Sequence, residues 1–380
     1  MRLHTIPLSL YIHFPWCLSK CSYCDFNSFQ LPDKAVIPIY VNQLLFDLKQ
    51  ESNRLPNDRL ISVYFGGGTP SLIPPSLVNI LVAEVKNLFQ CSSDIEVTME
   101  INPGTMNSEM YLQLKEAGIN RVSLGVQSFN DEILKTLYRV HRRDEVLEAI
   151  RCISLAGFDN FNLDLMFALP NQSISDAIED LRQAIDCNST HLSWYHLSLD
   201  FQSNDGKDIH NNLPKEEEVW EIQRSGIDYL NKNGFKQYEI SAYAKSLQHF
   251  CIHNLNYWNY GDYLGVGSGA HGKITTEEYQ IRRYIKISNP EKYSIANNLY
   301  EYNQFVVEQE IPLEFMLNAL RLYQPIPYSL FRNRTGIEID FIYDRLIQAE
   351  KMELLSLTSD AIAVTSKGKD FLNNLLEIFL

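Results

Sequence analysis

The sequence lacks the long apolar runs of a membrane protein and the basic excess of a nucleic-acid binder. No stretch of about 18 apolar residues, the length a helix needs to cross a bilayer, occurs in the 380-residue chain. The N-terminal residues include no apolar segment typical of a signal peptide. Lys and Arg number 33 against 47 Asp and Glu, so the formal net charge is −14. Such a charge disfavours phosphate backbones, and we expect a cytoplasmic protein without a nucleic-acid partner.

The chain also lacks a disulfide framework. It has seven cysteines, an odd number, and Cys17, Cys21 and Cys24 fall close together while the other four are scattered singly. Small secreted domains spread paired cysteines through a short chain. A chain of 380 residues buries enough apolar surface to fold without cross-links. Clustered thiols in a cytoplasmic protein indicate a metal or redox site.

Short β-rich runs alternate with amphipathic helical stretches over residues 1–235. The expected strands are Leu8–Ile12, Ile61–Phe65, Ile95–Ile101, Arg121–Val126, Phe161–Met166 and His191–Leu199. The expected helices are Tyr40–Glu51, Ser76–Phe89, Ser108–Ala117, Arg143–Leu155 and Ser173–Asp186. Repeated βα units form a parallel sheet with helical crossovers. The pattern predicts an α/β fold, as either an open doubly wound sheet or a partial (β/α)6 TIM-like barrel.

Polar residues at the strand ends favour the barrel. They are Gly66 to Thr69, Glu100, Gln127, Asp164 and His196. In a barrel these positions meet at one mouth, on the C-terminal face where functional sites are built. A single Asp or Glu at a strand end is often only a helix cap, but this succession predicts a shared site.

The remaining chain predicts two further parts. Phe201–Pro214 reads as a polar linker, followed by a helix at about Lys215–Asn233, and residues 236–300 form a connecting segment. Residues 301–380 are expected as a small α+β winged-helix-like domain. Its expected elements are the helices Leu313–Tyr323 and Asp340–Met352, a hairpin with Asp360 near its turn, and the helix Lys369–Phe379. Winged helices often bind DNA, but the acidic charge favours a structural lid.

The spacing of the three cysteines in the string CLSKCSYC indicates which kind of metal site they can form. Three thiolates spaced Cys-x3-Cys-x2-Cys can hold three corners of a [4Fe-4S] cube. The fourth iron then stays open to bind S-adenosylmethionine (SAM), and an electron from the cluster can cleave the sulfonium to a 5′-deoxyadenosyl radical. The alternative is a structural zinc site of three cysteines and a distal histidine. The usual zinc pattern has two separated Cys-x2-Cys knuckles, which this sequence does not contain.

The motif resembles the signature of the radical-SAM superfamily, with Tyr23 before the last cysteine and Phe26 two residues after it. The strings SLYIHFPWC, FGGGTPSL, EINPGT, GVQSF, HNLNYW and DYLGVGSGAHG resemble the anaerobic coproporphyrinogen III oxidase family, and within it the subfamily of haem chaperones. This resemblance covers essentially the whole chain. It implies a [4Fe-4S] cluster, SAM and haem as cofactors, and an acceptor haemoprotein as partner, membrane-associated respiratory proteins being one class of acceptor. Monomer and dimer both stay open.

The resemblance also assigns residues. It implies that Cys17, Cys21 and Cys24 hold the cluster, that Tyr11 packs by the SAM site, and that Gly67, Gly68 and Thr69 meet the methionine end of SAM. It implies further SAM contacts from four side chains, Glu100, Gln127, Arg139 and Asp164. From residue type alone, Arg139 would be a surface helix residue. From residue types alone, His253, Tyr257 and Trp258 are expected as packed residues that join the barrel to the C-terminal part. The string HNLNYW is the motif linked to haem in the family, and this resemblance makes His253 the expected axial ligand of the iron.

Three alternatives and departures bear on function. The oxidases carry a further cysteine where this chain has Phe26, and they have a longer N-terminal extension, so both features favour the chaperone over coproporphyrinogen decarboxylation. A tRNA-modifying radical enzyme is a more distant alternative. Where the family has a glycine after Asp164, this chain has Phe167 and Ala168, and a need for positive φ there would strain the turn. The other histidines, His13, His191, His196 and His271, are expected in structural or supporting roles.

Overall fold

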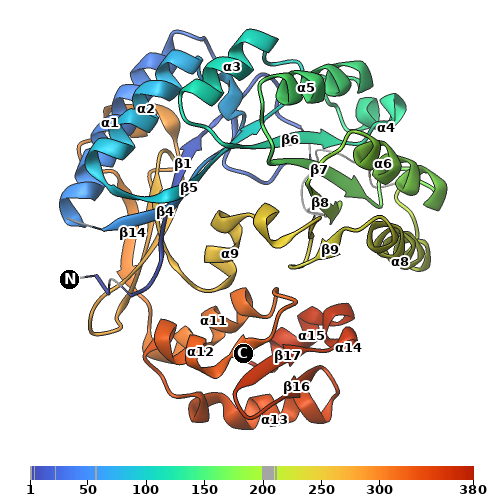
Figure 1. The fold of residues 1–380 in the computed structure, drawn as a ribbon. Helices are drawn as coiled ribbons and strands as arrows, with labels where there is room; N and C mark the ends of the chain where they lie inside the picture. Colours follow the sequence, from blue (N-terminus) through green and yellow to red (C-terminus); the bar gives the residue numbers. More distant parts are fainter. Residues whose placement is uncertain (1, 4, 22, 56–57, 199–208, 210–211) are drawn as a thin grey trace.

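The computed structural model describes residues 2–3, 5–21, 23–55, 58–198, 209 and 212–380. Its first part is a curved sheet lined on the outside by helices, and its C-terminal part packs across the open side of that curve (Figure 1). Among all the described residues, no helix is both long and apolar enough to cross a bilayer. The expected linker Phe201–Pro214 and the end of the expected strand at Leu199 lie largely outside the described residues.

The described strands of the barrel form one twelve-stranded sheet in the order β14-β13-β12-β11-β1-β4-β5-β6-β7-β8-β10-β9. Its parallel strands are β1 (Leu8–Phe14), β4 (Arg59–Gly67), β5 (Gln90–Ile101), β6 (Arg121–Gln127), β7 (Phe161–Phe167), β8 (His191–His196) and β11 (Asp262–Val266). The antiparallel edges are β9 (Lys236–Gln237), β10 (Ala242–Ala244), β12 (His271–Thr275), β13 (Ile281–Lys286) and β14 (Tyr300–Phe305). The end strands β14 and β9 do not pair, so the predicted partial barrel is confirmed and the doubly wound alternative is not.

Helices cover the convex face of the sheet (Figure 1). They are α1 (Val36–Arg54), α2 (Pro75–Leu88), α3 (Ser108–Glu116), α4 (Asp131–Thr136), α5 (Arg143–Leu155), α6 (Ile174–Asp186) and α8 (Glu216–Lys232). Two of them are followed, one residue past the cap, by Gly118 and Gly157 at φ +100 and +76, a backbone conformation that glycine adopts without steric cost. The helical periodicity therefore located these crossovers within a few residues.

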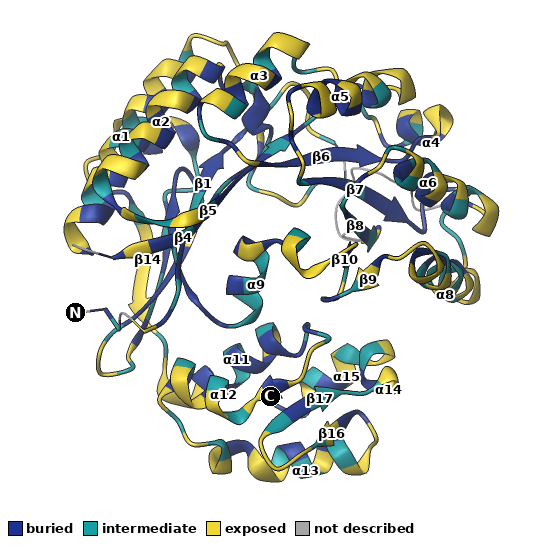
Figure 2. Ribbon diagram, viewed as in Figure 1, coloured by how far each residue is buried: buried dark blue, intermediate teal, exposed yellow. Residues whose placement is uncertain are grey.

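The core lies on both sides of the parallel strands (Figure 2). All seven residues of β6 are buried, as expected for a central strand covered by helices on one face and by the barrel interior on the other. The barrel interior is filled in part by α9 (Ile252–Trp258), which lies on the concave side of the sheet. Residues 236–300, expected as a connecting segment, supply this helix and also β9 to β13, which extend the sheet at both edges.

The C-terminal part has a small core of its own around Phe315 and Phe331. Its elements are α11 (Ile311–Ala319), β15 (Ile326–Pro327), α12 (Tyr328–Thr335), α13 (Tyr343–Lys351), β16 (Leu355–Leu357), β17 (Ala361–Val364), α14 (Ser366–Asp370) and α15 (Leu372–Glu377). The described chain also contains the short strands β2 (Trp16–Cys17) and β3 (Phe29–Gln30), the helix α10 (Pro290–Ile295), and 3₁₀ turns at Pro70–Leu72, Leu247–His249, Glu308–Glu310 and Ile339–Ile342.

The expected wing is present as the hairpin β16–β17, within a three-stranded sheet ordered β15-β17-β16. Two details differ from expectation. The helix predicted over Lys369–Phe379 is interrupted at Phe371, whose φ and ψ of −117 and 44 are not helical. The helix α12 was not predicted, because its eight residues YSLFRNRT carry too few apolar positions to show a helical period.

A buried ion cluster ties the antiparallel edge of the sheet to α1. The ammonium of Lys286 on β13 lies 2.6 Å from an Asp47 carboxylate oxygen and 2.7 Å from one of Glu51, and all three side chains are fully buried. The Tyr293 hydroxyl donates to Asp47 at 2.7 Å. Burial nevertheless holds the pKa of Asp47 above its ordinary value, with Lys286 opposing the shift. Asp47 therefore depends on this one buried cation, whereas Glu51 also pairs with Arg54, 3.0 Å away.

Replacing Lys286 by Met leaves Asp47 and Glu51 buried without their ammonium partner. We expect the free energy of unfolding to fall by about 3–5 kcal/mol, the usual cost of breaking a buried pair from one side. The loss shrinks as the pH falls, because protonation of the raised-pKa Asp47 removes its unpaired charge. Urea unfolding at several pH values measures this, with Lys292→Met on exposed α10 as the control. A pH-independent loss below 1 kcal/mol would contradict the account.

Candidate functional site

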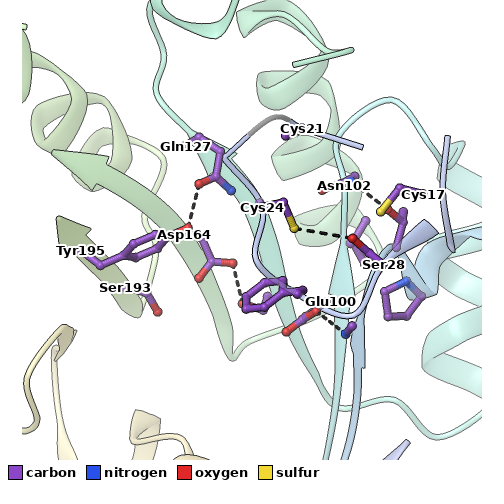
Figure 3. Close-up of a pocket in the computed structure, with 18 of the residues that line it drawn as sticks. Cys17, Cys21, Cys24, Ser28, Glu100, Asn102, Gln127, Asp164, Ser193 and Tyr195 are labelled. Atoms are coloured by element: carbon purple, nitrogen blue, oxygen red, sulfur yellow. Dashed lines mark hydrogen bonds between the residues drawn. The ribbon is translucent and has the colours of Figure 1, made fainter. Parts of the chain in front are cut away.

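Ten of the twelve predicted site residues line one cavity of about 320 Å³ at the C-terminal edge of the parallel strands (Figure 3). They are Cys17, Cys21, Cys24, Gly67, Gly68, Thr69, Glu100, Gln127, Arg139 and Asp164. The strand ends converge here because parallel strands bring all their carboxyl ends to one face of a barrel. In Figure 3 the loop that carries Cys17 and Cys24 faces the end of β7 across the cavity.

The three clustered thiols lie at one wall of the cavity, Cys17 at the end of β2 and the others in the loop that follows. All three are free and half-buried. Burial raises the pKa of Cys17, Thr69 opposes the shift through a hydrogen bond, and the two other thiols raise it further. The Arg139 guanidinium donates to the Cys21 sulfur at 3.6 Å. The thiols are thus close enough to interact and lie next to a fixed positive charge.

This donor set fits a cluster held by three thiolates. Among the described residues, no three His, Cys, Asp or Glu side chains converge on one point as a single metal ion requires. An iron–sulfur cube does not require its protein ligands to converge on one point, since each thiolate binds a different iron. The cavity lining includes three cysteines and no fourth among the described residues. One iron of such a cube would therefore face the cavity without a cysteine ligand.

The glycine run at the end of β4 forms the floor of the cavity. Gly67 has φ +117, and its amide donates to a carboxylate oxygen of Glu100 at 3.1 Å. A Cβ at Gly67 would lie 2.6 Å from the His13 ring, and one at Gly68 would lie 2.7 Å from the Trp16 carbonyl oxygen. Only residues without a Cβ fit here, because β1 and the residues that follow it approach this backbone closely.

Two carboxylates face the cavity, Glu100 from β5 and Asp164 from β7, and β6 lies between these two strands. Glu100 accepts from the Tyr64 hydroxyl at 2.9 Å, and burial together with Asp164 raises its pKa to about 7. Asp164 accepts from the Ser123 hydroxyl at 2.9 Å and the Asn162 amide at 2.7 Å, while burial raises its pKa above the ordinary value. Two half-buried carboxylates whose negative charges disfavour each other provide a setting for a cationic ligand or for hydroxyl donors.

Gln127 and Arg139 also line the cavity, and each has an uncommon structural feature. Gln127 has φ +68 and accepts from the Tyr195 hydroxyl at 2.8 Å. Arg139, just after α4, donates to the Asn102 side chain at 3.0 Å and to the Gly125 carbonyl at 3.2 Å. Its Nε is buried and has no hydrogen-bond partner among the described residues. A buried donor without a partner is costly, so this atom is a candidate contact for a bound ligand.

The other two predicted residues lie outside this cavity. Tyr11 lines a neighbouring cavity of about 590 Å³, which shares part of its wall with the first. Its hydroxyl lies 3.0 Å from Nδ1 of His13. His253 lines neither cavity: it is 1% exposed, in the first turn of α9 inside the barrel.

Both ring nitrogens of His253 are already hydrogen-bonded. Nδ1 lies 3.0 Å from the Ser62 hydroxyl, which itself donates to Ser9 at 2.7 Å. Ser62 therefore accepts from His253, and Nδ1 carries the proton. Nε2 then accepts from the Tyr257 hydroxyl at 2.9 Å. Burial lowers the pKa of His253 to about 3, with Arg121 adding to the shift, so the ring is neutral. In this arrangement its lone pair does not fit the role of an axial haem ligand.

Sequence reasoning missed Asn102, Ser193 and Tyr195, which line the cavity, and pointed instead to His196. His196 lines a different cavity, together with Ala168. The strand period explains the error, because side chains alternate faces and Ser193 and Tyr195 on β8 point inward when His196 does not.

The departure after Asp164 has a structural consequence. Ala168 is buried at φ +58, the left-handed region that disfavours residues with a Cβ, so the expected strain is present. Phe167 packs against Trp194 with ring centroids 4.4 Å apart and does not line the cavity. The substitution thus strains the turn without placing an aromatic ring in the site.

Replacing Gly67 by Ala tests whether the glycine floor binds SAM. The new methyl group meets the His13 ring in addition to the unfavourable φ, so we expect SAM affinity to fall by about tenfold or more, equal to ~1.4 kcal/mol. The matched control is Gly157→Ala, which has φ +76 but open space around its Cβ. It is expected to cost about 1 kcal/mol of stability and to leave SAM binding unchanged. Equal SAM affinities for both variants in calorimetric titrations would rule out this role.

The comparisons with known proteins agree with this geometry. Residues 11–184 match the model of the radical SAM superfamily, and residues 307–371 match that of the HemN C-terminal domain. The chain is 41% identical over 374 residues to the heme chaperone HemW of Escherichia coli K12 and 40% identical over 382 residues to that of Haemophilus influenzae, and each match covers 98% of both chains. The crystal structure of E. coli coproporphyrinogen III oxidase (HemN) superimposes with a TM-score of 0.85 at 20% identity, covering 100% of this chain and 91% of that one.

The HemN match shows a shared fold from the first strand to the C-terminal domain. The HemW matches show more, because they combine about 40% identity with nearly complete coverage of both chains. The chain is therefore a radical-SAM-fold protein that belongs to the HemW family of haem chaperones.

Proposed function

We propose that this protein is a haem chaperone that carries a [4Fe-4S] cluster and SAM in its first cavity and passes haem to an acceptor haemoprotein. The nearly full-length identity to HemW chaperones carries this proposal. The protein is proposed to act in the cytoplasm, with haem as cargo and membrane-associated respiratory proteins among its acceptors. The net charge of −14 supports a partner other than nucleic acid.

The cavity residues divide between the two cofactors. Cys17, Cys21 and Cys24 would hold the cluster, and the backbone of Gly67 and Gly68 would face the methionine end of SAM, beside Thr69. When bound, the cluster supplies an electron for cleavage of the SAM sulfonium. The side chains of Glu100, Gln127, Arg139 and Asp164 would fix the remaining parts of SAM.

Each of these side chains would make a particular contact with SAM. The unpartnered Nε of Arg139 would donate to a SAM oxygen. Glu100, held by Tyr64 and by the Gly67 amide, would accept from the amino group or a ribose hydroxyl. Gln127 would present its amide donor, because its oxygen is already occupied by Tyr195. Tyr11 would support the site from the neighbouring cavity.

Phe26 distinguishes this chain from the coproporphyrinogen oxidases. It is 62% exposed and lines both cavities, at the position where the oxidases carry a further cysteine. A phenyl ring here offers apolar contact to a flat ligand and no thiol for chemistry. The shared fold with HemN supports coproporphyrinogen decarboxylation only as a competing function, which the same sample can test.

We expect cluster-loaded protein to bind one equivalent of haem, seen as a Soret band in an anaerobic titration. The same preparation is expected to show no conversion of coproporphyrinogen III in the presence of SAM and a reductant. Steady turnover to protoporphyrinogen IX would replace the chaperone proposal with the oxidase. Absence of a saturable Soret band would remove the chaperone proposal altogether.

Replacing Cys24 by Ala tests the cluster assignment, because it removes one of three thiolates and leaves a second iron without its protein ligand. We expect reconstituted Cys24→Ala to retain less than about half of the wild-type iron and sulfide. Cys91→Ala is the matched control, since Cys91 is also free and half-buried but lies away from the cavity. Equal iron content in the two variants would contradict the assignment.

A further inference from the structure

The second cavity, of about 590 Å³, lies directly beside the first and shares Phe26, Gly67, Glu100 and Trp258 with it. Its walls come from β1, the cluster loop, α9, β11, β12 and the C-terminal helix α11. This volume is within the range of small-molecule and cofactor sites. None of the three predicted cluster cysteines lines it.

Aromatic side chains form much of its wall. The rings of Tyr257 and Tyr263 meet edge to face with centroids 4.5 Å apart, and Trp258 follows Tyr257 on α9. The largely exposed ring of Phe26 closes the side toward the cluster loop. Aromatic faces and edges of this kind suit a flat aromatic ligand.

Three histidines lie in or behind this cavity, and they differ in what their ring nitrogens contact. His13 has Nδ1 beside the Tyr11 hydroxyl at 3.0 Å and Nε2 beside the Asn27 carbonyl at 2.9 Å. His253 is buried with both nitrogens occupied. His271, at the start of β12, lines the cavity and is exposed, and its ring makes no hydrogen bond within the described part of the chain.

We propose that the second cavity is the haem seat and that His271, rather than His253, supplies the axial ligand of the haem iron. This inference rests on the proposed chaperone function, since it names where and through which atom the cargo binds. A neutral imidazole with a free lone pair is the commonest protein ligand of haem iron. Among the three histidines, His271 alone offers one without breaking an existing hydrogen bond.

One polar atom of the shared wall fits the propionate groups of a haem. The indole Nε1 of Trp258 is buried and has no hydrogen-bond partner among the described residues, so it would donate to an anionic propionate. The Arg321 guanidinium lies 5.1 Å from the centre of the Trp258 ring but lines neither cavity. Two carboxylates, Asp25 and Glu100, line the second cavity, so the propionates would lie away from them.

The inference leaves His253 a positioning role. Its Nε2 holds the hydroxyl of Tyr257, and so fixes the ring that lines the haem seat. A loss of haem after His253→Ala would therefore follow from either role. Tyr257→Phe separates them, because it frees Nε2 of His253 and keeps an aromatic ring at position 257.

The experiment is a haem titration of the cluster-loaded full chain, followed by its Soret maximum and apparent Kd. His271→Ala is expected to shift the Soret maximum and weaken binding by about tenfold or more, and added imidazole is expected to restore the spectrum. His196→Ala is the matched control, an exposed histidine without a described side-chain hydrogen bond that lines another cavity. It is expected to behave as wild type, and Tyr257→Phe is expected to keep the wild-type Soret maximum.

Failure of wild type to bind haem would remove the proposed function and this inference with it. Wild-type binding with an unchanged Kd and Soret maximum in His271→Ala would leave the chaperone function standing and overturn the assignment of His271. Tighter binding by Tyr257→Phe would likewise overturn it, because it would show that Tyr257 competes with iron for the His253 lone pair.

Discussion

The buried carboxylate of Glu96 holds the helix α9 inside the barrel, and both cavities take their shape from that helix. Glu96 lies on β5 and accepts from the amides of Ile252 and His253, each at 3.1 Å. Carboxylates are favourable at helix N-termini, where the first amides have no partner within the helix. Arg121 on β6 balances the charge from 3.9 Å. One buried anion thus anchors the N-terminus of a helix that lies inside the open barrel.

The fixed position of α9 gives the residues of the HNLNYW motif, 253–258, two different roles. The side that turns toward the sheet is immobilised, since His253 bonds to Ser62 and Asn256 bonds to Ser9. Tyr257, which His253 contacts, and Trp258 at the end of the helix supply aromatic rings to the cavity wall. The motif that suggested a haem ligand therefore contributes a scaffold and an aromatic wall, while the free imidazole comes from β12. The C-terminal domain closes the same space through Asn318 on α11.

Much of the site could be predicted from the sequence, because the patterns that indicate these residues are local in the chain. Glu100, Gln127 and Asp164 could be located from strand ends alone, and the spacing of Cys17, Cys21 and Cys24 is itself a motif. Arg139 could be assigned only through resemblance, since nothing near it in the sequence shows that it turns back to Asn102 and Cys21. His196 was selected over Tyr195 because strand boundaries cannot be located to one residue, and one residue changes the face.

The position of α9 could not be predicted at all, because it depends on a contact between Glu96 and a helix more than 150 residues later in the chain. From residue types alone, His253, Tyr257 and Trp258 are expected as packed residues, and the family resemblance instead made His253 a haem ligand. The long-range packing shows that both nitrogens of His253 are occupied. The most direct measurement is therefore a crystal structure of the haem-loaded protein. We predict iron bound to His271 in the second cavity, with the bond between His253 and Tyr257 intact. Iron bound to His253, with α9 displaced from Glu96, would contradict this account.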